Sequence, residues 1–142
     1  MNGNEKERKS LTMDATTENL YQALGFVDEQ LEQMECSPAV QMRIDLVVEE
    51  LFVNVAHYAY APETGSVTIS IETEGDSKAV VISMEDSGVP YDPLAKEDPD
   101  VTLAAQDRQI GGLGIFMIKK NVDDIHYERK DGKNILTFKK FI

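Results

Sequence analysis

The sequence from Pro38 to Asn54 reads PAVQMRIDLVVEELFVN. Ser37 stands before this stretch, so an N-cap residue is followed by the residue that is favoured at the first position of a helix. Apolar residues then recur at steps of three and four, which predicts a long helix that ends near Tyr60, before Pro62. The stripe that this helix is expected to bury comprises Ile44, Val47, Val48, Leu51, Phe52 and Val55.

The sequence before this helix predicts a second helix and a strand. From Thr17 the apolar residues again step by three or four, and Thr16 or Thr17 can cap the start. Weak alternation around Leu11 and Met13 indicates an edge strand, and we expect residues 1–10 to be flexible. The apolar positions of this earlier helix are Leu20, Leu24, Val27, Leu31 and Met34.

Two hairpins are predicted after the long helix. Val67, Ile69 and Ile71 alternate strictly, and Gly75-Asp76 separates them from a second apolar run at residues 80–84. Near the end, strands at residues 125–128 and 135–141 flank a turn at residues 130–133. A third helix is expected between the hairpins, over residues 114–121.

Length and charge exclude several classes of protein. A chain of 142 residues is long enough for one domain, so we expect a single domain over residues 1–142. The net charge of −12 argues against direct binding to nucleic acid, which requires a basic surface. The chain has no apolar run near the ~20 residues that span a bilayer and no signal peptide at its start, so we expect no membrane association and a cytoplasmic location.

Glu50 and Asn54 form the first candidate site. They are four residues apart on the long helix, so their side chains share one face and can reach one ligand. An amide oxygen suits Mg²⁺, which keeps several waters and takes its other ligands from phosphates. Glu50 could act as a general base, with Glu49 as its rival. The alternative is that both residues belong to the solvated face of the helix.

Asp86 and Gly88 form the second candidate site. Asp86 ends an apolar run where the chain turns, and a carboxylate there can accept the exocyclic amine of adenine. Gly88 would let a base approach the backbone closely. A plain Asp-Ser-Gly turn is the alternative. Residues 87–110 hold three prolines and many charges, which favours a lid over residues 91–110.

A glycine cluster precedes the third helix and forms the last candidate site. It comprises Gly111, Gly112, Leu113 and Gly114, and the unpaired N–H groups of a helix start favour phosphate. The cluster fits neither a P-loop nor a dinucleotide-binding turn, and a flexible linker is the alternative. Arg108 could reach a terminal phosphate, or it could be an exposed arginine of the lid.

Taken in order, these motifs resemble those of GHKL-type, histidine-kinase-like ATPases, and among them the small bacterial anti-sigma-factor serine/threonine kinases. The resemblance covers the chain from about Thr17 to Ile142. It implies an α+β fold, a two-layer sandwich with helices on one face of a mixed, mainly antiparallel sheet. It also implies ATP with Mg²⁺ as cofactors. The implied roles are Glu50 as catalytic base, Asn54 on the metal, Asp86 on adenine, Gly88 beside the base, and Gly112 and Gly114 at the phosphates.

The function that this resemblance implies is phosphorylation of a serine or threonine on a small antagonist protein, within a partner-switching circuit. It further implies a homodimer that holds a sigma factor or another regulator. Two alternatives stay open. One is a module that uses bound nucleotide only to control protein binding, and the other is a separate ATP-binding domain that hydrolyses ATP without a protein acceptor.

Overall fold

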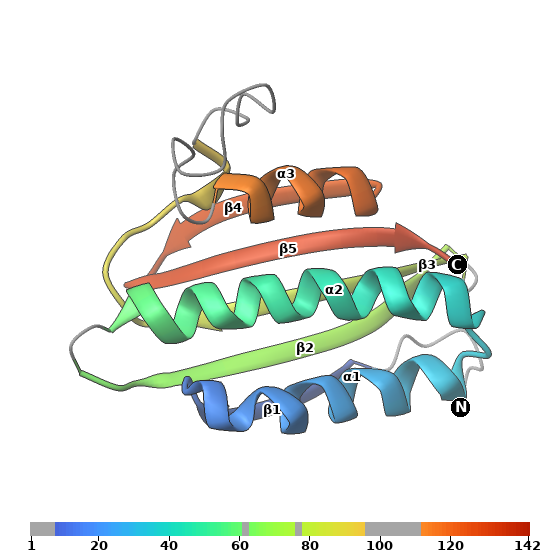
Figure 1. Cartoon of the computed structure of the whole chain (residues 1–142), viewed down its shortest axis with the longest axis horizontal. Coiled ribbons are helices and arrows are strands. Elements are labelled where there is room, and N and C mark those ends of the chain that lie inside the picture. Colours follow the sequence, from blue (N-terminus) through green and yellow to red (C-terminus); the bar gives the residue numbers. More distant parts are fainter. Residues whose placement is uncertain (1–7, 61–62, 76–77, 96–111) are drawn as a thin grey trace.

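A computed structural model of the chain describes residues 8–60, 63–75, 78–95 and 112–142. These residues form a five-stranded sheet in the order β1-β2-β3-β5-β4, and α1, α2 and α3 lie side by side over one face of it (Figure 1). Each of the four strand pairings within this described part is antiparallel. The expected two-layer α+β fold with a mainly antiparallel sheet is therefore confirmed.

The N-terminal half of the chain contains the edge strand and two helices. Strand β1 spans Lys9–Asp14, helix α1 spans Leu20–Gln33, and helix α2 spans Pro38–Asn54. Ser37 caps α2 as predicted, because its hydroxyl accepts a hydrogen bond from the Val40 N–H at 3.3 Å. A π-helical turn, Val55–Ala59, continues α2 almost to Tyr60, where the helix was expected to end.

Two expectations for this half differ from the structure. The strand β1 begins inside the stretch expected to be flexible, since Lys9 and Ser10 pair with Ile71 and Ser70 in the sheet; residues 1–7 lie outside the described part. Neither threonine caps α1 with its side chain. A 3-10 turn, Thr17–Asn19, leads into the helix instead, and the Asn19 side-chain amide donates to the Asp14 carbonyl at 2.9 Å.

The C-terminal half of the chain contains both predicted hairpins. The first joins β2, Ser66–Glu74, to β3, Ala79–Asp86, and the second joins β4, Asp124–Lys130, to β5, Lys133–Phe141. Asp131 and Gly132 form a two-residue turn with φ values of 54° and 78°, which suits the twist of the strands it joins. Helix α3 spans Gly112–Asn121 and starts two residues earlier than predicted.

One apolar core lies between the two layers. Alternate residues of the strands face the helices, whereas the residues between them face away. None of the described helices is both long and apolar enough to cross a membrane. The largest fully buried side chains belong to all three helices and to three central strands; they include Val27, Leu31, Ile44, Phe52, Ile69, Ile82, Ile118 and Phe138.

Two carboxyl groups meet where α1 packs against α2. Asp28 and Asp45 each have an Oδ1 atom that is buried without a hydrogen-bond partner among the described residues. Burial, followed by the hydrogen bond and the charge of Asp28, raises the pKa of Asp45 from 3.8 to about 8. Asp45 therefore keeps its proton at neutral pH.

The raised pKa of Asp45 predicts how the stability of the fold depends on pH. Between 3.8 and about 8 the folded chain keeps a proton on Asp45 that the unfolded chain has released, so the free energy of unfolding falls as pH rises through this window. Asp45→Asn removes the titrating group and lets an amide donate to Asp28. We expect this variant to lose less stability on going from about pH 5 to about pH 9, as measured by urea unfolding. Glu29→Gln, on the exposed side of α1, is the control. The assignment would be contradicted if Asp45→Asn lost as much stability over this pH range as the wild type, or if both variants reduced the loss equally.

Candidate functional site

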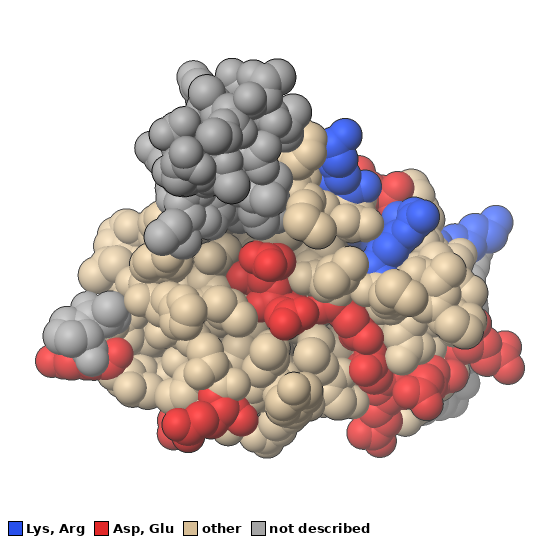
Figure 2. Space-filling view, in the orientation of Figure 1, with Lys and Arg blue, Asp and Glu red and all other residues tan. Residues whose placement is uncertain are grey.

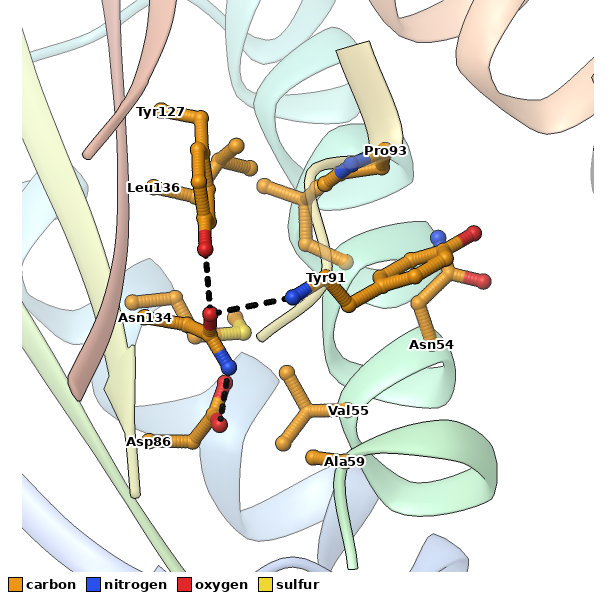
Figure 3. Close-up of a pocket in the computed structure, with 11 residues that line it drawn as sticks. Asn54, Val55, Ala59, Asp86, Tyr91, Pro93, Tyr127, Asn134 and Leu136 are labelled. Atoms are coloured by element: carbon orange, nitrogen blue, oxygen red, sulfur yellow. Dashed lines mark hydrogen bonds between the residues drawn. The ribbon is translucent and has the colours of Figure 1, made fainter. Parts of the chain in front are cut away.

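A pocket opens between the end of α2 and the adjoining ends of β3, β4 and β5 (Figure 3). Its empty volume is about 440 Å³, which includes space open to solvent, and its lining is mostly apolar. Pockets of this size that carry a few polar groups are typical of small-molecule sites. The lining residues are Leu51, Asn54, Val55, Ala59, Met84, Asp86, Tyr91, Pro93, Tyr127, Asn134 and Leu136.

Asp86 provides the carboxylate of this pocket. It ends β3 and is only 7% exposed. Its Oδ1 atom accepts hydrogen bonds from the Gly88 N–H at 2.9 Å and from the Asn134 side-chain amide at 3.0 Å. Among the described residues no group donates a hydrogen bond to its Oδ2 atom, and Asp86 lines the pocket. The pocket therefore contains an acceptor oxygen that is available to a ligand with an N–H group.

Gly88 holds the loop after Asp86 against the end of the α2 helix. A Cβ atom at this position would lie 2.2 Å from the carbonyl oxygen of Ala59. The neighbouring Val89 N–H donates to the same oxygen at 2.9 Å. A glycine is thus required here for packing of the chain on itself, in addition to any approach of a ligand.

Asn54 lies at the last position of α2, where the helix changes to the π-helical turn. Such turns occur frequently at functional sites. Among the described residues the side-chain amide of Asn54 has no hydrogen-bond partner, and the residue lines the pocket. Its oxygen is therefore available to a ligand, and its role as a metal contact stays a prediction.

Glu50 does not line the same pocket. It lies one turn before Asn54 and borders a smaller hollow between α2 and α3, together with Leu46, Met117 and Asn121. Glu49, the rival base, is exposed and borders neither hollow. The structure thus brings Asn54 together with Asp86 and places Glu50 at a neighbouring depression.

The glycine cluster lies at the start of α3. Gly112, Leu113 and Gly114 belong to the first turn of the helix, where the backbone N–H groups lack partners within the helix. This turn contains no acidic residue, and Lys119 and Lys120 stand in the last turn. The helix can therefore present its positive end to an anion. Gly111, Arg108 and most of the predicted lid, residues 96–110, lie outside the described part of the chain.

Asn134 is a residue of the pocket that the sequence analysis missed. It is buried on β5, directly opposite Asp86 on β3. Its Oδ1 atom accepts from the Tyr127 hydroxyl and from the Tyr91 N–H, and its amide nitrogen donates to Asp86 and to the Val89 carbonyl. A signal was present, because the alternation of Asn134, Leu136 and Phe138 places a polar residue on the core face.

Tyr60 is a second residue whose role the sequence did not indicate. Its hydroxyl donates to the Ser66 carbonyl at 2.6 Å and accepts from the Ser87 N–H at 2.7 Å. Its ring occupies the space that a side chain at position 65 would need, since a Cβ atom on Gly65 would lie 2.2 Å from it. Tyr60 therefore ties the end of the helix to the adjoining ends of β2 and β3.

The described residues include no group of three or more His, Cys, Asp and Glu side chains that could hold a metal ion among themselves. Asn54 contributes a neutral amide oxygen to the described part of the pocket. That donor fits an ion such as Mg²⁺, whose remaining ligands are water and the phosphates of a bound nucleotide.

Comparison with known proteins gives concordant results. A profile of the family described as histidine kinase-like ATPase domain matches residues 13–140. The serine/threonine-protein kinase BtrW of Bordetella bronchiseptica is 23% identical over 128 residues, which cover 90% of this chain and 89% of that protein. The serine-protein kinase RsbW of Bacillus cereus is 24% identical over 120 residues, which cover 82% of this chain and 68% of that protein.

A solved structure shares the fold. The structure of the RsbU and RsbW domains of Rv1364c from Mycobacterium tuberculosis superposes with a TM-score of 0.68 at 17% identity. The match covers 95% of this chain but only 32% of that chain. This chain therefore corresponds to about a third of that larger protein, and at this identity the likeness concerns the fold alone.

The close contact at Gly88 predicts a pair of opposite effects on stability. Gly88→Ala forces a methyl group against the Ala59 carbonyl and should destabilise the fold by about 1–3 kcal/mol, as overpacking does. Gly25→Ala, in the exposed middle of α1 where nothing lies within 4 Å of the new atom, should stabilise it by about 0.5–1 kcal/mol. Urea unfolding measures both changes. Equal effects of the two substitutions would show that the contact at Gly88 is not required.

Proposed function

This chain belongs to the family of histidine kinase-like ATPase domains, and from that membership we propose that it is an ATP-dependent serine/threonine protein kinase. The observation that carries the proposal is the free Oδ2 atom of Asp86 in a pocket that also contains the unpartnered amide of Asn54. A carboxylate oxygen suits the exocyclic amine of adenine and repels the carbonyl of guanine. The two named kinases that the chain resembles support the reaction type.

The triphosphate would lie between Asn54 and the first turn of α3. The backbone N–H groups of Gly112, Leu113 and Gly114 are the donors that we assign to its oxygens. When bound, Mg²⁺ would be held by Asn54 and by phosphate oxygens, and it would neutralise charge on the phosphates. Arg108 and Gly111 remain proposed contacts on the grounds of sequence.

The proposed reaction is attack of a serine or threonine hydroxyl on the terminal phosphate of ATP. The bond between oxygen and phosphorus forms as the bond to the ADP leaving group breaks, and the hydroxyl proton passes to Glu50. Glu50 is half-buried at the hollow between α2 and α3, one turn from Asn54. This position, one turn from the proposed metal ligand, supports the assignment of Glu50 as the base.

We propose a small antagonist protein as the phosphoacceptor, within a partner-switching circuit in the cytoplasm. We further propose that the chain forms a homodimer, which holds a sigma factor or another regulator. Both parts rest on the resemblance to anti-sigma-factor kinases. Figure 2 shows acidic side chains in a band across the middle of the helical face, and Glu29, Glu32 and Glu49 are exposed acidic residues of α1 and α2. An acceptor that approaches Glu50 over this face would need basic groups of its own.

A second candidate function follows from the position of Glu50. Because Glu50 borders a hollow other than the one that contains Asn54 and Asp86, nucleotide could bind without supporting transfer. The chain would then be a protein-binding module whose shape depends on ATP, or an ATP-binding domain without a protein acceptor.

Substitution of the proposed base separates these functions. Glu50→Gln should lower the rate of phosphate transfer to the acceptor by about a hundredfold or more, with ATP affinity unchanged, because it removes the proton acceptor and leaves the pocket intact. Transfer is measured with labelled ATP and a candidate antagonist. Glu49→Gln is the matched control, since that residue is adjacent and exposed. Undiminished transfer in Glu50→Gln would remove the residue from the reaction.

Substitution of Asp86 tests adenine recognition. Asp86→Asn can turn a donor toward the amine of adenine, so ATP affinity should fall by about tenfold or more, whereas GTP affinity should not fall. Calorimetric titration with each nucleotide in the presence of Mg²⁺ measures the two affinities. An equal loss for both nucleotides would contradict a contact with the base.

A further inference from the structure

We propose that Asn134 is a positioning residue that sets the purine selectivity of the pocket, because it fixes which oxygen of Asp86 meets the ligand. The inference rests on the proposed binding of ATP and concerns a residue to which no motif of the sequence assigned a role. Asn134 is 6% exposed, and both ends of its amide are bonded to protein (Figure 3).

The orientation of the Asn134 amide follows from its partners. Its Oδ1 atom faces the backbone N–H of Tyr91 at 3.3 Å, and an N–H can only donate. Its nitrogen faces the carbonyl oxygen of Val89 at 2.8 Å, and a carbonyl can only accept. A flipped amide would oppose like groups at both places, so the nitrogen must be the atom that faces Asp86.

This orientation determines what Asp86 can offer to a ligand. The Asn134 nitrogen lies 3.0 Å from the Oδ1 atom of Asp86, and the Gly88 N–H lies 2.9 Å from the same atom. Two donors on one oxygen hold the carboxylate in one rotamer, and its Oδ2 atom is left as an acceptor for the pocket. Loss of the donor from Asn134 would allow the carboxyl group to rotate or to carry a proton toward the ligand.

The same side chain also places one wall of the pocket. Through the Val89 carbonyl and the Tyr91 N–H it holds the segment that runs from Asp86 toward Pro93. The centre of the Tyr91 ring lies 6.1 Å from the centre of the Tyr58 ring, and Tyr58 belongs to the π-helical turn. Asn134 therefore connects Asp86, the carboxylate proposed to bind adenine, to the segment that carries the Tyr91 ring.

The strand register makes this placement possible. Lys130 pairs with Lys133 across the two-residue turn, and Asp86 pairs with Asn134 across β3 and β5. A slip of one residue would turn the amide to the opposite face of the sheet. Asn134 thus reaches Asp86 by pairing in the sheet, although the two residues are 48 positions apart in sequence.

The test is calorimetric titration of Asn134→Asp with MgATP and MgGTP. The new carboxyl group replaces the donor by an oxygen that must share a proton with Asp86 or repel it. We expect the preference for ATP over GTP, the ratio of the two dissociation constants, to fall by about tenfold, because ATP loses its acceptor while GTP gains a possible donor. Asn19→Asp is the matched control, since its amide also donates to an oxygen, the Asp14 carbonyl, and neither residue lines the pocket.

Each outcome decides a different point. An unchanged ratio in Asn134→Asp, with both affinities lowered alike and the unfolding midpoint lowered, would overturn the proposal and leave Asn134 a purely structural residue. If Asn134→Asp does not fold, Asn134→Ser replaces it, and the same loss of preference supports the proposal while an unchanged ratio overturns it. Failure of the wild type to bind either nucleotide would instead overturn the proposed function, on which the inference rests.

Discussion

The hydrogen bond between Asn134 and Asp86 is the interaction on which the site depends, because it joins β3 and β5 at the point where the pocket begins. β3 and β5 pair along their whole length, and this pair of residues stands at the end of that pairing. Both side chains point into the helical layer, where apolar residues surround them. In such surroundings an unpaired polar group costs about 1–3 kcal/mol, so the two residues require each other.

The loop after β3 has no regular structure, yet its backbone is held throughout. The Tyr60 hydroxyl accepts the Ser87 N–H, and Asp86 accepts the Gly88 N–H. Arg129 donates to the Gly88 carbonyl at 2.8 Å, and Ala59 accepts the Val89 N–H. The partners outside the loop come from the π-helical turn and Tyr60 after it, from β4, and from Asn134 on β5. The loop is therefore positioned by the sheet and by the helix layer at once, which is what a site with fixed geometry requires.

Sequence reasoning was sufficient for the elements and insufficient for the contacts between them. Periods of three to four and of two are local properties, so α1, α2 and both hairpins could be predicted from them. The Ser37 cap is local as well. The Asn134 amide, by contrast, acts on residues far away in the sequence, and only the strand register brings them together. The predicted threonine cap of α1 was wrong for a related reason. A 3-10 turn leads into the helix, and the Asn19 side chain bonds back to the Asp14 carbonyl.

The charge of the chain explains why the site takes this form. The net charge of the chain is −12, acidic residues lie across the helical face, and the described residues that line the pocket include no lysine or arginine. The start of α3 offers positive potential from its backbone, since no acidic side chain there offsets the helix dipole. The lysines of that helix, Lys119 and Lys120, lie in its last turn, where they stabilise the negative pole of the dipole. The proposed phosphate site therefore relies on the backbone N–H groups at the start of α3 and on a metal ion held by the Asn54 amide, and not on a cluster of basic side chains.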